Sequence, residues 1–443
     1  MTLKTTRRKF VKQSSLIAGG LMAVPILGRG TNFFSGSSGE IKVAVIGCGG
    51  RGTGAAFQAL QSKQNVKIVA LADAFKDRLN DCYNKLMTED LSDMGIKGNL
   101  KAKVDVPESR RFVGFDAYQK AIPFADVVIL ATPPGFRPSH FEEAVKQGKH
   151  VFMEKPVAVD PAGVKKVLDA AAIAKQKKLN VVVGLQRRYQ TSYRELFKRK
   201  ELIGDLVSGQ VWWNNPGVWM KKREPNQTEM EYQMRNWYYF NWLCGDHILE
   251  QHIHNIDVMN WFKGDFPIRA QGMGGRQVRT GKEYGEIYDH HYVEFMYADG
   301  TMMNSQCRHI PGTMNKVDEL LVGAKGRIFC GEAVIRDNKG KELYRFDRKK
   351  DNNPFQNEHD ELFAAIANGQ YKFDNAEYGA KSTLTAVMGR MATYSGQVIE
   401  ADKTLASGID IMPKELSWTA NPPTLPDANG FYPIAMPGKT KYF

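Results

Sequence analysis

The sequence of 443 residues contains few cysteines, and their scarcity excludes two kinds of structure. The five cysteines are odd in number, far apart and without a CxxC spacing; they are Cys48, Cys82, Cys244, Cys307 and Cys330. A disulfide framework or a cysteine-based zinc site needs paired or closely spaced thiols. We therefore expect all five to be buried free thiols.

The chain also lacks internal repeats, long blocks of lysine and arginine, and any later apolar run long enough to span a membrane. The formal net charge is +13, but residues 1–30 carry six positive charges and no negative ones. The remaining +7 is spread along the chain, which argues against a function in binding nucleic acid. About 400 residues follow the N-terminal segment, enough for two domains with ample core.

The first 38 residues have the composition of an export signal. Arg7 and Arg8 lie in the basic stretch Thr6–Lys12, and the short apolar stretch Ser15–Leu27 follows. This order is typical of a twin-arginine signal, whose translocase exports proteins already folded and commonly loaded with a cofactor. We expect a periplasmic protein without a stable membrane anchor, and no Ala-x-Ala motif defines the cleavage site. The alternative is a disordered basic N-terminus of a cytoplasmic protein.

A glycine-rich turn follows the first folded strand. The β-rich run 41–46 leads directly into Gly47-Cys48-Gly49-Gly50-Arg51-Gly52, and residues 53–62 continue as a helix. In a dinucleotide-binding turn the first glycine allows the tight bend, the second lets the backbone approach a pyrophosphate, and the third lets the helix pack on the strand. The phosphates lie at the helix N-terminus, where free N–H groups point outward. The sequence therefore predicts a Rossmann-type cofactor site.

A carboxylate at the end of the next strand indicates which dinucleotide is bound. The strand 66–72 ends at Asp73, 21 residues after Gly52. A carboxylate at this distance accepts hydrogen bonds from the adenosine ribose and repels a 2′-phosphate, so we expect NAD as the cofactor. The apolar strand 125–131 follows, and then Thr132-Pro133-Pro134 and a helix that contains His140. The alternative is a glycine turn with an unrelated surface aspartate.

The residues that follow carry a resemblance to a known family. Gly148-Lys149-His150-Val151 begins another strand, which ends in Glu154-Lys155-Pro156. Together with the glycine turn and the Ala-Thr-Pro turn at 131–133, these motifs resemble the Gfo/Idh/MocA oxidoreductases, which include glucose–fructose oxidoreductase and inositol dehydrogenases. The resemblance covers most of the chain and is most specific over residues 41–160. More distantly, the chain is similar to the NAD-dependent glycoside hydrolases of family 109, which depart from Glu-Lys-Pro.

The resemblance implies roles for the residues at the cofactor. Pro156 takes the place of a cis-proline at the domain junction, and Lys155 that of a catalytic lysine beside the nicotinamide and the reacting hydroxyl. Independently, a lysine at the carboxyl end of a parallel strand faces the ligand crevice, although a surface lysine is the alternative. The residues expected to contact NAD are Gly47, Gly49, Gly50, Arg51, Gly52, Asp73, Thr132, Pro133, His140, Glu154, Lys155 and Gln186.

A second group of polar residues lies in the segment Gly245–Asp257. Its apolar residues suit a helix with one buried face, on which Glu250, His254 and Asp257 form one stripe. Asp246 would extend this stripe at the start of the helix. The resemblance places His254 at the family's catalytic histidine, as the general base, and Glu250 at an acid that is usually aspartate. Glu250 would bind or polarise the sugar.

A metal site in the same segment is an alternative. His247 with Glu250, or Glu250 with His254, could supply a pair of ligands. At roughly 100° per residue, however, His252 lies about 160° from His254, so one helix cannot bring every histidine to one point. We therefore expect no bound metal. Histidines that only pack in the core or cap the helix are a further alternative.

Aromatic residues are concentrated between these two regions. Six of the seven tryptophans lie within fifty residues, from Trp212 to Trp261. Flat rings stack on the C–H faces of sugars, and Tyr and Trp keep a polar edge for hydroxyls. The strand-like alternation of side chains at 210–213 leaves open a core or interface role for some of these rings. The long polar segment 214–236 predicts a loop over the crevice. The expected substrate residues are Arg187, Trp237, Tyr238, Tyr239 and Asp246.

The rest of the chain predicts a second domain. Alternating runs near 292–297, 301–308 and 316–322 are typical of antiparallel strands, and helices follow near 358–368 and 381–395. In the resembled family the open face of such a sheet makes oligomer contacts, so we expect a homo-oligomer. The expected organisation is a signal and linker (1–38), an α/β Rossmann domain (39–157), an α+β substrate and oligomerisation domain with a mixed or antiparallel open sheet (158–411), and a surface tail (412–443).

These observations favour an exported NAD-dependent enzyme that oxidises a secondary hydroxyl of a sugar or glycoside. A periplasmic enzyme cannot easily exchange spent cofactor, so we expect tightly bound NAD that is recycled on the protein. One alternative is a glycosidase that uses NAD transiently, by oxidation, elimination, hydration and reduction. Another is a non-catalytic sugar sensor on the same fold. The sugar, the electron acceptor and the number of subunits stay open.

Overall fold

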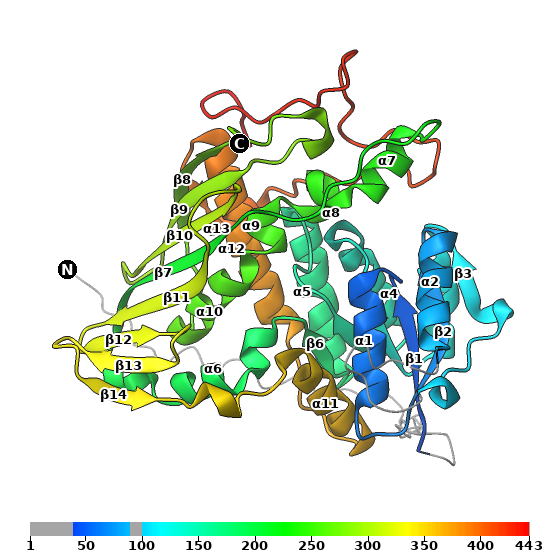
Figure 1. Cartoon of the computed structure of the whole chain (residues 1–443), viewed down its shortest axis with the longest axis horizontal. Coiled ribbons are helices and arrows are strands. Elements are labelled where there is room, and N and C mark those ends of the chain that lie inside the picture. The colour runs from blue at the N-terminus through cyan, green and yellow to red at the C-terminus, as the bar shows by residue number, and fades with distance from the viewer. Residues whose placement is uncertain (1–38, 89–99, 443) are drawn as a thin grey trace, which may run out of the picture. The chain divides into compact units, whose positions relative to one another are not determined.

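The computed structural model describes residues 39–88 and 100–442, and Gly39–Phe443 forms one compact unit (Figure 1). The predicted twin-arginine signal and its linker, residues 1–38, lie outside the described residues. In the described part of the chain, no helix combines the length and the apolar character needed to cross a membrane. All five cysteines are buried and free, as expected.

The first sheet has six parallel strands in the order β3-β2-β1-β4-β5-β6. Its strands are β1 (Ile41–Ile46), β2 (Val66–Asp73), β3 (Arg111–Val113), β4 (Val127–Leu130), β5 (His150–Met153) and β6 (Val181–Val183). The central strands are almost wholly buried because helices cover both faces. The strand order reverses between β1 and β4, and ligands bind beyond the carboxyl ends of the strands at such a reversal. The predicted Rossmann fold is confirmed.

The helices around this sheet come from both halves of the chain. The connecting helices are α1 (Gly50–Gln61), α2 (Lys76–Leu86), α3 (Ala117–Ala121), α4 (Arg137–Lys146) and α5 (Pro161–Gln176). α5 begins where Asp160 Oδ1 accepts a hydrogen bond from the Gly163 N–H (2.7 Å). α11 (Pro354–Ala367) packs against α1 (Figure 1). A helix from the C-terminal half of the chain therefore completes the helical cover of the first sheet.

The second sheet has nine strands in the order β14-β13-β12-β11-β7-β10-β9-β8-β15. β7 and β10 pair in parallel and the other pairs are antiparallel, so the predicted mixed sheet is confirmed. Buried and partly exposed residues alternate along β9 and β10 because only one face is covered. The strands are β7 (Leu206–Asn215), β8 (Arg269–Gly275), β9 (His290–Met296), β10 (Met302–His309), β11 (Lys316–Gly323), β12 (Gly326–Phe329), β13 (Val334–Asp337), β14 (Glu342–Arg345) and β15 (Ile399–Glu400).

Two helices cover one face of the second sheet, and one of them also joins the two sheets. α10 (Ile253–Lys263) and α12 (Ala376–Ser395) pack on its strands, and α12 also packs on α5. Most residues of α12 are buried, so little of this helix faces water. The other helices of this half are α6 (Thr191–Phe197), α7 (Glu229–Arg235), α8 (Asn241–Cys244), α9 (His247–Glu250) and α13 (Ala401–Ala406).

The single helix predicted over Gly245–Asp257 is wrong, because this segment forms α9 and α10 with a break between them. Gly245 and Asp246 have φ angles of 76° and 74°, a left-handed backbone that an α-helix excludes. In the break, the N–H of His252 donates to the carbonyl of His247 (3.1 Å), one residue farther back than in an α-helix. The expected stripe along one helix is therefore interrupted.

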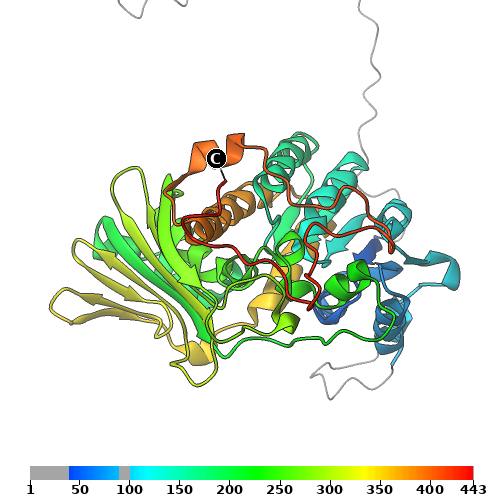
Figure 2. The same cartoon turned by 90° about the horizontal axis from the view of Figure 1, so that it is seen from above.

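The C-terminal tail, residues 407–442, contains neither helix nor strand and follows the surface of the unit (Figure 2). From α13 it runs to the first sheet's side, where Trp418 packs against Phe75 with ring centroids 4.9 Å apart. It then returns to the second sheet, where Tyr288 donates a hydrogen bond to the carbonyl of Ala435 (2.8 Å). The tail thus connects the two halves on the outside.

Candidate active site

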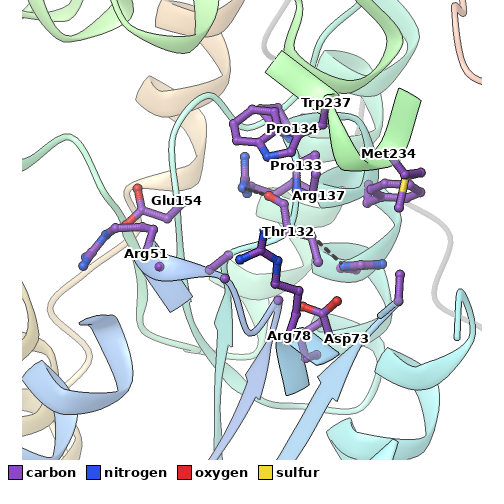
Figure 3. A pocket seen from close by; sticks show the side chains of 18 of the residues that line it. Arg51, Asp73, Arg78, Thr132, Pro133, Pro134, Arg137, Glu154, Met234 and Trp237 are labelled. Atoms are coloured by element: carbon purple, nitrogen blue, oxygen red, sulfur yellow. Dashed lines mark hydrogen bonds and ion pairs between the residues drawn. The ribbon is translucent and has the colours of Figure 1, made fainter. Parts of the chain in front are cut away.

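A cavity of about 730 Å³ lies beyond the carboxyl ends of the parallel strands (Figure 3). Residues of the segment 213–237 and of α9 and α10 complete its wall. Most of the residues predicted from the sequence line it: Gly47, Gly49, Gly50, Arg51, Asp73, Thr132, Pro133, His140, Glu154, Lys155, Gln186, Trp237, Glu250 and His254. The fold therefore brings the predicted cofactor residues and catalytic residues to one place.

The glycine loop fits a pyrophosphate. A Cβ atom on Gly52 would lie 1.7 Å from the carbonyl oxygen of Gly47, and one on Gly47 would lie 2.5 Å from the nitrogen of Thr132, so packing requires both glycines. A Cβ atom on Gly49 or Gly50 would meet nothing within 4 Å, and both residues line the cavity. α1 begins here without a capping side chain, so its first N–H groups are available to an anion.

Asp73, the last residue of β2, lines one end of the cavity. Phe75, Arg78 and Phe115 line the same end, which we term the adenosine end. Asp73 Oδ2 accepts a hydrogen bond from the Cys48 N–H (2.6 Å), and Oδ1 accepts one from the Phe75 N–H (2.8 Å). Burial raises the pKa of Asp73, against the opposing effect of these donors. Arg78 lies beside it (Figure 3) and was not predicted. The carboxylate is held where ribose hydroxyls would bind.

Arg51 links the glycine loop to the Glu-Lys-Pro segment. Its guanidinium pairs with Glu154 (Figure 3), donates to Gln58 Oε1 (2.8 Å) and lies 3.4 Å from Glu358 of α11. Burial and the charge of Glu154 raise the pKa of Glu358 well above its usual range. Arg51 thus lines the cavity while its charge is engaged inside the protein. Glu358 was not predicted, because it lies 307 residues from Arg51 in the sequence.

Arg137 and His140 of α4 hold two strand ends together. The buried guanidinium of Arg137 donates to the carbonyls of Pro156 and Thr132, and burial lowers the pKa of Arg137 to about 10. The Lys155–Pro156 peptide bond is cis, as the resemblance implied. His140 Nδ1 lies 3.3 Å from Thr132 Oγ1, and burial lowers the pKa of His140 to about 3. The histidine therefore contributes a neutral ring to the wall.

Lys155, Glu250 and His254 line the same cavity and form what we term the catalytic end. Lys155 Nζ donates to the backbone carbonyl of Glu250 and to Glu250 Oε1 (3.1 Å). Glu250 Oε2 and His254 Nδ1 are buried and have no hydrogen-bond partner among the described residues. Buried polar atoms are normally paired, so these two mark where a polar ligand would bind.

Burial shifts the pKa values of Glu250 and His254. It raises the pKa of Glu250, and the charge of Lys155 opposes that rise. It lowers the pKa of His254 well below its usual range, and the charges of Lys155 and Arg187 lower it further. The ring of Trp213 lies against His254, with centroids 6.0 Å apart. His254 is therefore neutral at physiological pH and able to accept a proton.

Among the described residues, five that were predicted for the site do not line this cavity: Gly52, Arg187, Tyr238, Tyr239 and Asp246. Arg187 pairs with the buried Glu319, and the Tyr239 hydroxyl donates to the carbonyl of Trp219 (2.9 Å). Tyr238 is buried with its ring centroid 5.7 Å from that of His309. The side chains of Arg187, Tyr238 and Tyr239 thus contact other parts of the protein, and their contact with substrate stays a prediction.

Asp246 is the centre of a buried network. Its Oδ1 accepts a hydrogen bond from His247 Nδ1 (2.8 Å), and its Oδ2 accepts from the Tyr288 N–H (3.0 Å) and the Tyr394 hydroxyl (2.5 Å). Burial alone would raise the pKa of Asp246, but His291 and His247 hold it well below its usual range. Asp246, His247 and His291 lie close enough to hold a metal ion, yet protein donors already satisfy both carboxylate oxygens. The network fixes the start of α9.

Several residues of the wall were missed. Trp213 and Trp219 belong to the aromatic concentration seen in the sequence, and the position of Arg78 in the helix after Asp73 was a usable signal. The others depend on long-range packing that no local pattern reports. The missed residues include Phe75, Phe115, Tyr118, Arg137, Lys221, Met234, Arg235, Gln251 and Phe355.

Comparison with known proteins finds a family match in the first folded part of the chain. Residues 41–185 match the oxidoreductase family with an NAD-binding Rossmann fold (GFO_IDH_MocA). Residues 41–185 thus match the NAD-binding domain of this family. The matched range contains the glycine loop, Asp73 and Glu154-Lys155-Pro156. The prediction of NAD as the cofactor is therefore confirmed.

Curated relatives of this chain include dehydrogenases and a hydratase. Inositol 2-dehydrogenase of Serratia proteamaculans is 29% identical over 270 residues, which are 60% of this chain and 66% of the relative. Inositol 2-dehydrogenase 3 of Saccharopolyspora erythraea is 26% identical over 81% of this chain and 95% of the relative. The 2,7-anhydro-N-acetylneuraminate hydratase of Escherichia coli is 24% identical over 40% and 44%. The chain spans 44% to 66% of the length of the first three relatives.

Solved structures share the fold. Aldose–aldose oxidoreductase of Caulobacter crescentus, in complex with glycerol, superposes with a TM-score of 0.61 at 19% identity, over 82% of this chain and 99% of that one. Scyllo-inositol dehydrogenase of Lactobacillus casei, with bound NAD(H) and scyllo-inositol, gives the same TM-score, identity and coverage. The arrangement of a Rossmann domain and a second sheet is thus common to this chain and these proteins.

Proposed function

We propose that the protein is an NAD-dependent oxidoreductase that oxidises a secondary hydroxyl of a sugar or glycoside to a ketone, with NAD held tightly and regenerated on the enzyme. The observation that carries this proposal is that Lys155, Glu250 and His254 line one cavity together with the NAD-binding loop. Two polar atoms of this group are buried without a partner among the described residues. A sugar hydroxyl both donates and accepts hydrogen bonds, so it suits such atoms.

NAD fits the wall by the chemistry of its residues. Gly49, Gly50 and the N-terminus of α1 would hold the pyrophosphate, and Asp73 would accept hydrogen bonds from the adenosine ribose. The nicotinamide would then lie toward Glu154 and Lys155, at the carboxyl end of β5. When bound, NAD supplies the acceptor for the hydride that leaves the carbinol carbon.

The protein's own part in the reaction is to move one proton and to stabilise one oxygen. His254 is neutral, and its unpartnered Nδ1 is available to accept the hydroxyl proton as the carbinol becomes a ketone. The ammonium group of Lys155 donates to the hydroxyl oxygen while negative charge develops on it. Glu250 Oε2 accepts a hydrogen bond from a second hydroxyl and so orients the ring.

The aromatic part of the wall supports a sugar as the substrate. Trp213, Trp219 and Trp237 line the cavity together with the catalytic residues. Indole rings stack on the C–H faces of pyranoses and cyclitols and exclude water from the reacting carbon. The names of the relatives, inositol dehydrogenases and an aldose–aldose oxidoreductase, agree with a polyhydroxylated substrate.

A second candidate is the redox-neutral glycosidase. The observation that favours it is the similarity to hydratases, since adding water involves no net oxidation. Oxidation of one carbinol acidifies the neighbouring C–H, the aglycone is eliminated, water adds, and the ketone is reduced again. The retained Glu154-Lys155-Pro156 favours the oxidoreductase, because the family 109 hydrolases depart from this motif.

We also propose that the protein works in the periplasm as a homo-oligomer. The basic stretch with Arg7 and Arg8 supports export by the twin-arginine translocase. The partly exposed face of β9 and β10 supports contact with a second copy. A tightly bound cofactor follows from the same reasoning, because free NAD is not replenished outside the cytoplasm.

The test is to purify the protein without added cofactor, measure bound nucleotide by mass spectrometry and absorbance, and add glycosides and free sugars. The expected result is co-purified NAD that turns to NADH once with a sugar and is restored by a second sugar or keto compound. Loss of a glycoside with no net change in bound NAD would instead identify the glycosidase. Lys155→Ala and His254→Ala should lower the rate by about 10²–10⁴. Unchanged function in both variants would identify the sensor.

A further inference from the structure

We propose that a clasp formed by Phe75, Asp77, Arg235 and Trp418 closes the adenosine end of the cavity and slows release of the dinucleotide. The inference rests on the proposed NAD-dependent function and deepens it, because it names the residues that retain the cofactor. The clasp joins three segments that are far apart in the sequence: the start of α2, the end of α7 and the C-terminal tail.

The first contact of the clasp is a bidentate ion pair between α7 and α2. Arg235 Nη1 and Nη2 donate to Asp77 Oδ2 and Oδ1 at 2.7 and 2.9 Å, across 158 residues of sequence. Two parallel hydrogen bonds fix the plane of the guanidinium as well as its position. The hydrogen bond from Arg235 lowers the pKa of Asp77, so the pair stays ionised.

The second contact is the packing of Arg235 and Trp418 on the ring of Phe75. The guanidinium carbon of Arg235 lies 3.7 Å from the ring centroid of Phe75. Trp418 packs on Phe75 (4.9 Å) and on Phe115 (4.6 Å). Phe75, Phe115 and Arg235 themselves line the cavity. The ion pair and Trp418 therefore hold the wall of the adenosine end in place.

The tail and α7 also hold each other. Gln233 Nε2 donates to the carbonyl of Thr424 (2.7 Å), and the Tyr432 hydroxyl donates to Glu229 Oε1 (2.5 Å). Gln233 and Glu229 both belong to α7, which lies beside the tail in Figure 1. Because of these bonds, α7 and the tail would move together when the ion pair of the clasp opens.

The position of the clasp explains why it would retain a dinucleotide. Asp73 and Arg78 face the adenosine end from the side of the first sheet, and Met234 and Arg235 face the cavity from α7. An adenosine between these two sides leaves only when Arg235 separates from Asp77. The Asp77 side chain is 55% exposed, so the pair alone is weak and can open for loading, and stacking on Phe75 adds to it.

The test is the rate at which the full chain exchanges bound NAD for isotopically labelled NAD, followed by mass spectrometry. Asp77→Asn and Arg235→Gln should each speed the exchange about tenfold or more, and Asp77→Arg combined with Arg235→Asp should restore slow exchange. High salt should speed exchange in the wild type, because the pair is exposed. Trp418→Ala should also speed exchange, through a contact that carries no charge.

A matched control is available in the second sheet. Arg336 pairs with Glu332 (2.8 Å) and stacks over Phe329 (4.9 Å), so it makes the same two kinds of contact as Arg235 without lining the cavity. Arg336→Gln should leave the exchange rate at its wild-type value. A similar acceleration in this variant would show that loss of any such pair loosens the protein, which would overturn the clasp.

Two further results would overturn the proposal: unchanged exchange in both Asp77→Asn and Arg235→Gln, or a wild-type protein that binds no dinucleotide. Failure of the clasp and failure of the proposed function are distinguishable. Faster exchange in the variants, with no sugar oxidised by the wild type, would leave the clasp standing and remove the proposed function. Oxidation of a sugar together with unaffected exchange would remove only the clasp.

Discussion

Burial shifts the pKa values of two residues at the catalytic end, upward for Glu250 and downward for His254. In the proposed reaction the neutral His254 provides the base, and the pairing of Lys155 with Glu250 places two opposite charges 3.1 Å apart in a site where either alone would be costly. The Glu250 carboxylate contacts the Lys155 ammonium directly. Substrate hydroxyls must therefore compete with this pair for both charged groups.

The charge of the Asp73 carboxylate offers a test of the preference for NAD over NADP. The carboxylate repels a 2′-phosphate, whereas Arg78 on the same wall attracts one. Asp73→Asn keeps the shape of the side chain and removes its charge, so the ratio of the Kd values for NADP and NAD should fall at least about tenfold. Titration calorimetry on nucleotide-free protein measures both values. The double variant with Arg78→Gln should lose the gain, and an unchanged ratio in Asp73→Asn would contradict the assignment of the adenosine end.

His252 offers a test of what burial does to stability. Burial lowers the pKa of His252 to about 3, from 6.5 in the unfolded chain. Below pH 6.5 the unfolded state binds a proton that the native state does not, so this residue lowers the free energy of unfolding as the pH falls. His252→Asn does not titrate. On going from pH 7 to pH 5 it should therefore gain about 2 kcal/mol of unfolding free energy relative to the wild type, measured by urea denaturation. Parallel pH dependence of the two proteins would disprove the depressed pKa.

The glycine loop and α1 form an element in which neighbouring glycines have different tasks. Gly52→Ala would place a Cβ atom 1.7 Å from the Gly47 carbonyl oxygen, so it should lower the free energy of unfolding by about 2–3 kcal/mol. Gly50→Ala meets nothing within 4 Å and should change stability by about 0.5 kcal/mol or less. It should weaken NAD binding, because Gly50 lines the cavity where the phosphates would bind. Thermal unfolding and calorimetry separate the two effects. Equal loss of stability in both variants would show that the loop, and not the helix contact, limits substitution.

The first sheet could be predicted from the sequence because its signals are local. The strands β1, β2, β4 and β5 are short, mostly apolar runs, and the turn after β1 carries its glycines in order. The edge strand β3 has no such run and was not predicted. The break between α9 and α10 could not be predicted in this way. The periodicity of the segment suits one helix, but Asp246 has a left-handed backbone and is held by Tyr288 and Tyr394, which come from elsewhere in the chain.

In the candidate site, too, residues in local motifs could be predicted and residues defined by long-range contacts could not. Lys155, Glu250 and His254 were found because each lies in a motif that a single stretch of sequence contains. Glu358 and Trp418 were not found, because their importance comes from contacts with Arg51 and Phe75 across some 300 residues of chain. Aromatic concentration alone also could not separate Trp237, which lines the cavity, from Tyr239, which does not line it.

In the whole molecule, the two halves of the chain complete each other. α11 packs on α1, and Gln356 Nε2 donates to the carbonyl of Gln58 at its end (2.9 Å). The Val157 N–H donates to Thr383 Oγ1 of α12 (3.2 Å), which fixes the segment after the cis-proline. The helices that cover the first sheet therefore depend on residues far beyond the range that the family match defines.

This dependence predicts how a fragment behaves. Residues 39–185, the first sheet with its own helices, should not fold stably alone, because the faces that α11 and α12 cover would be exposed. Circular dichroism should show a broad, non-cooperative thermal transition for the fragment and a single sharp one for residues 39–442. Adding separately produced residues 186–442 should restore both the sharp transition and NAD binding. A fragment that melts cooperatively and binds NAD by itself would show that the first sheet is an independent domain, and that the C-terminal half adds only the substrate side of the cavity.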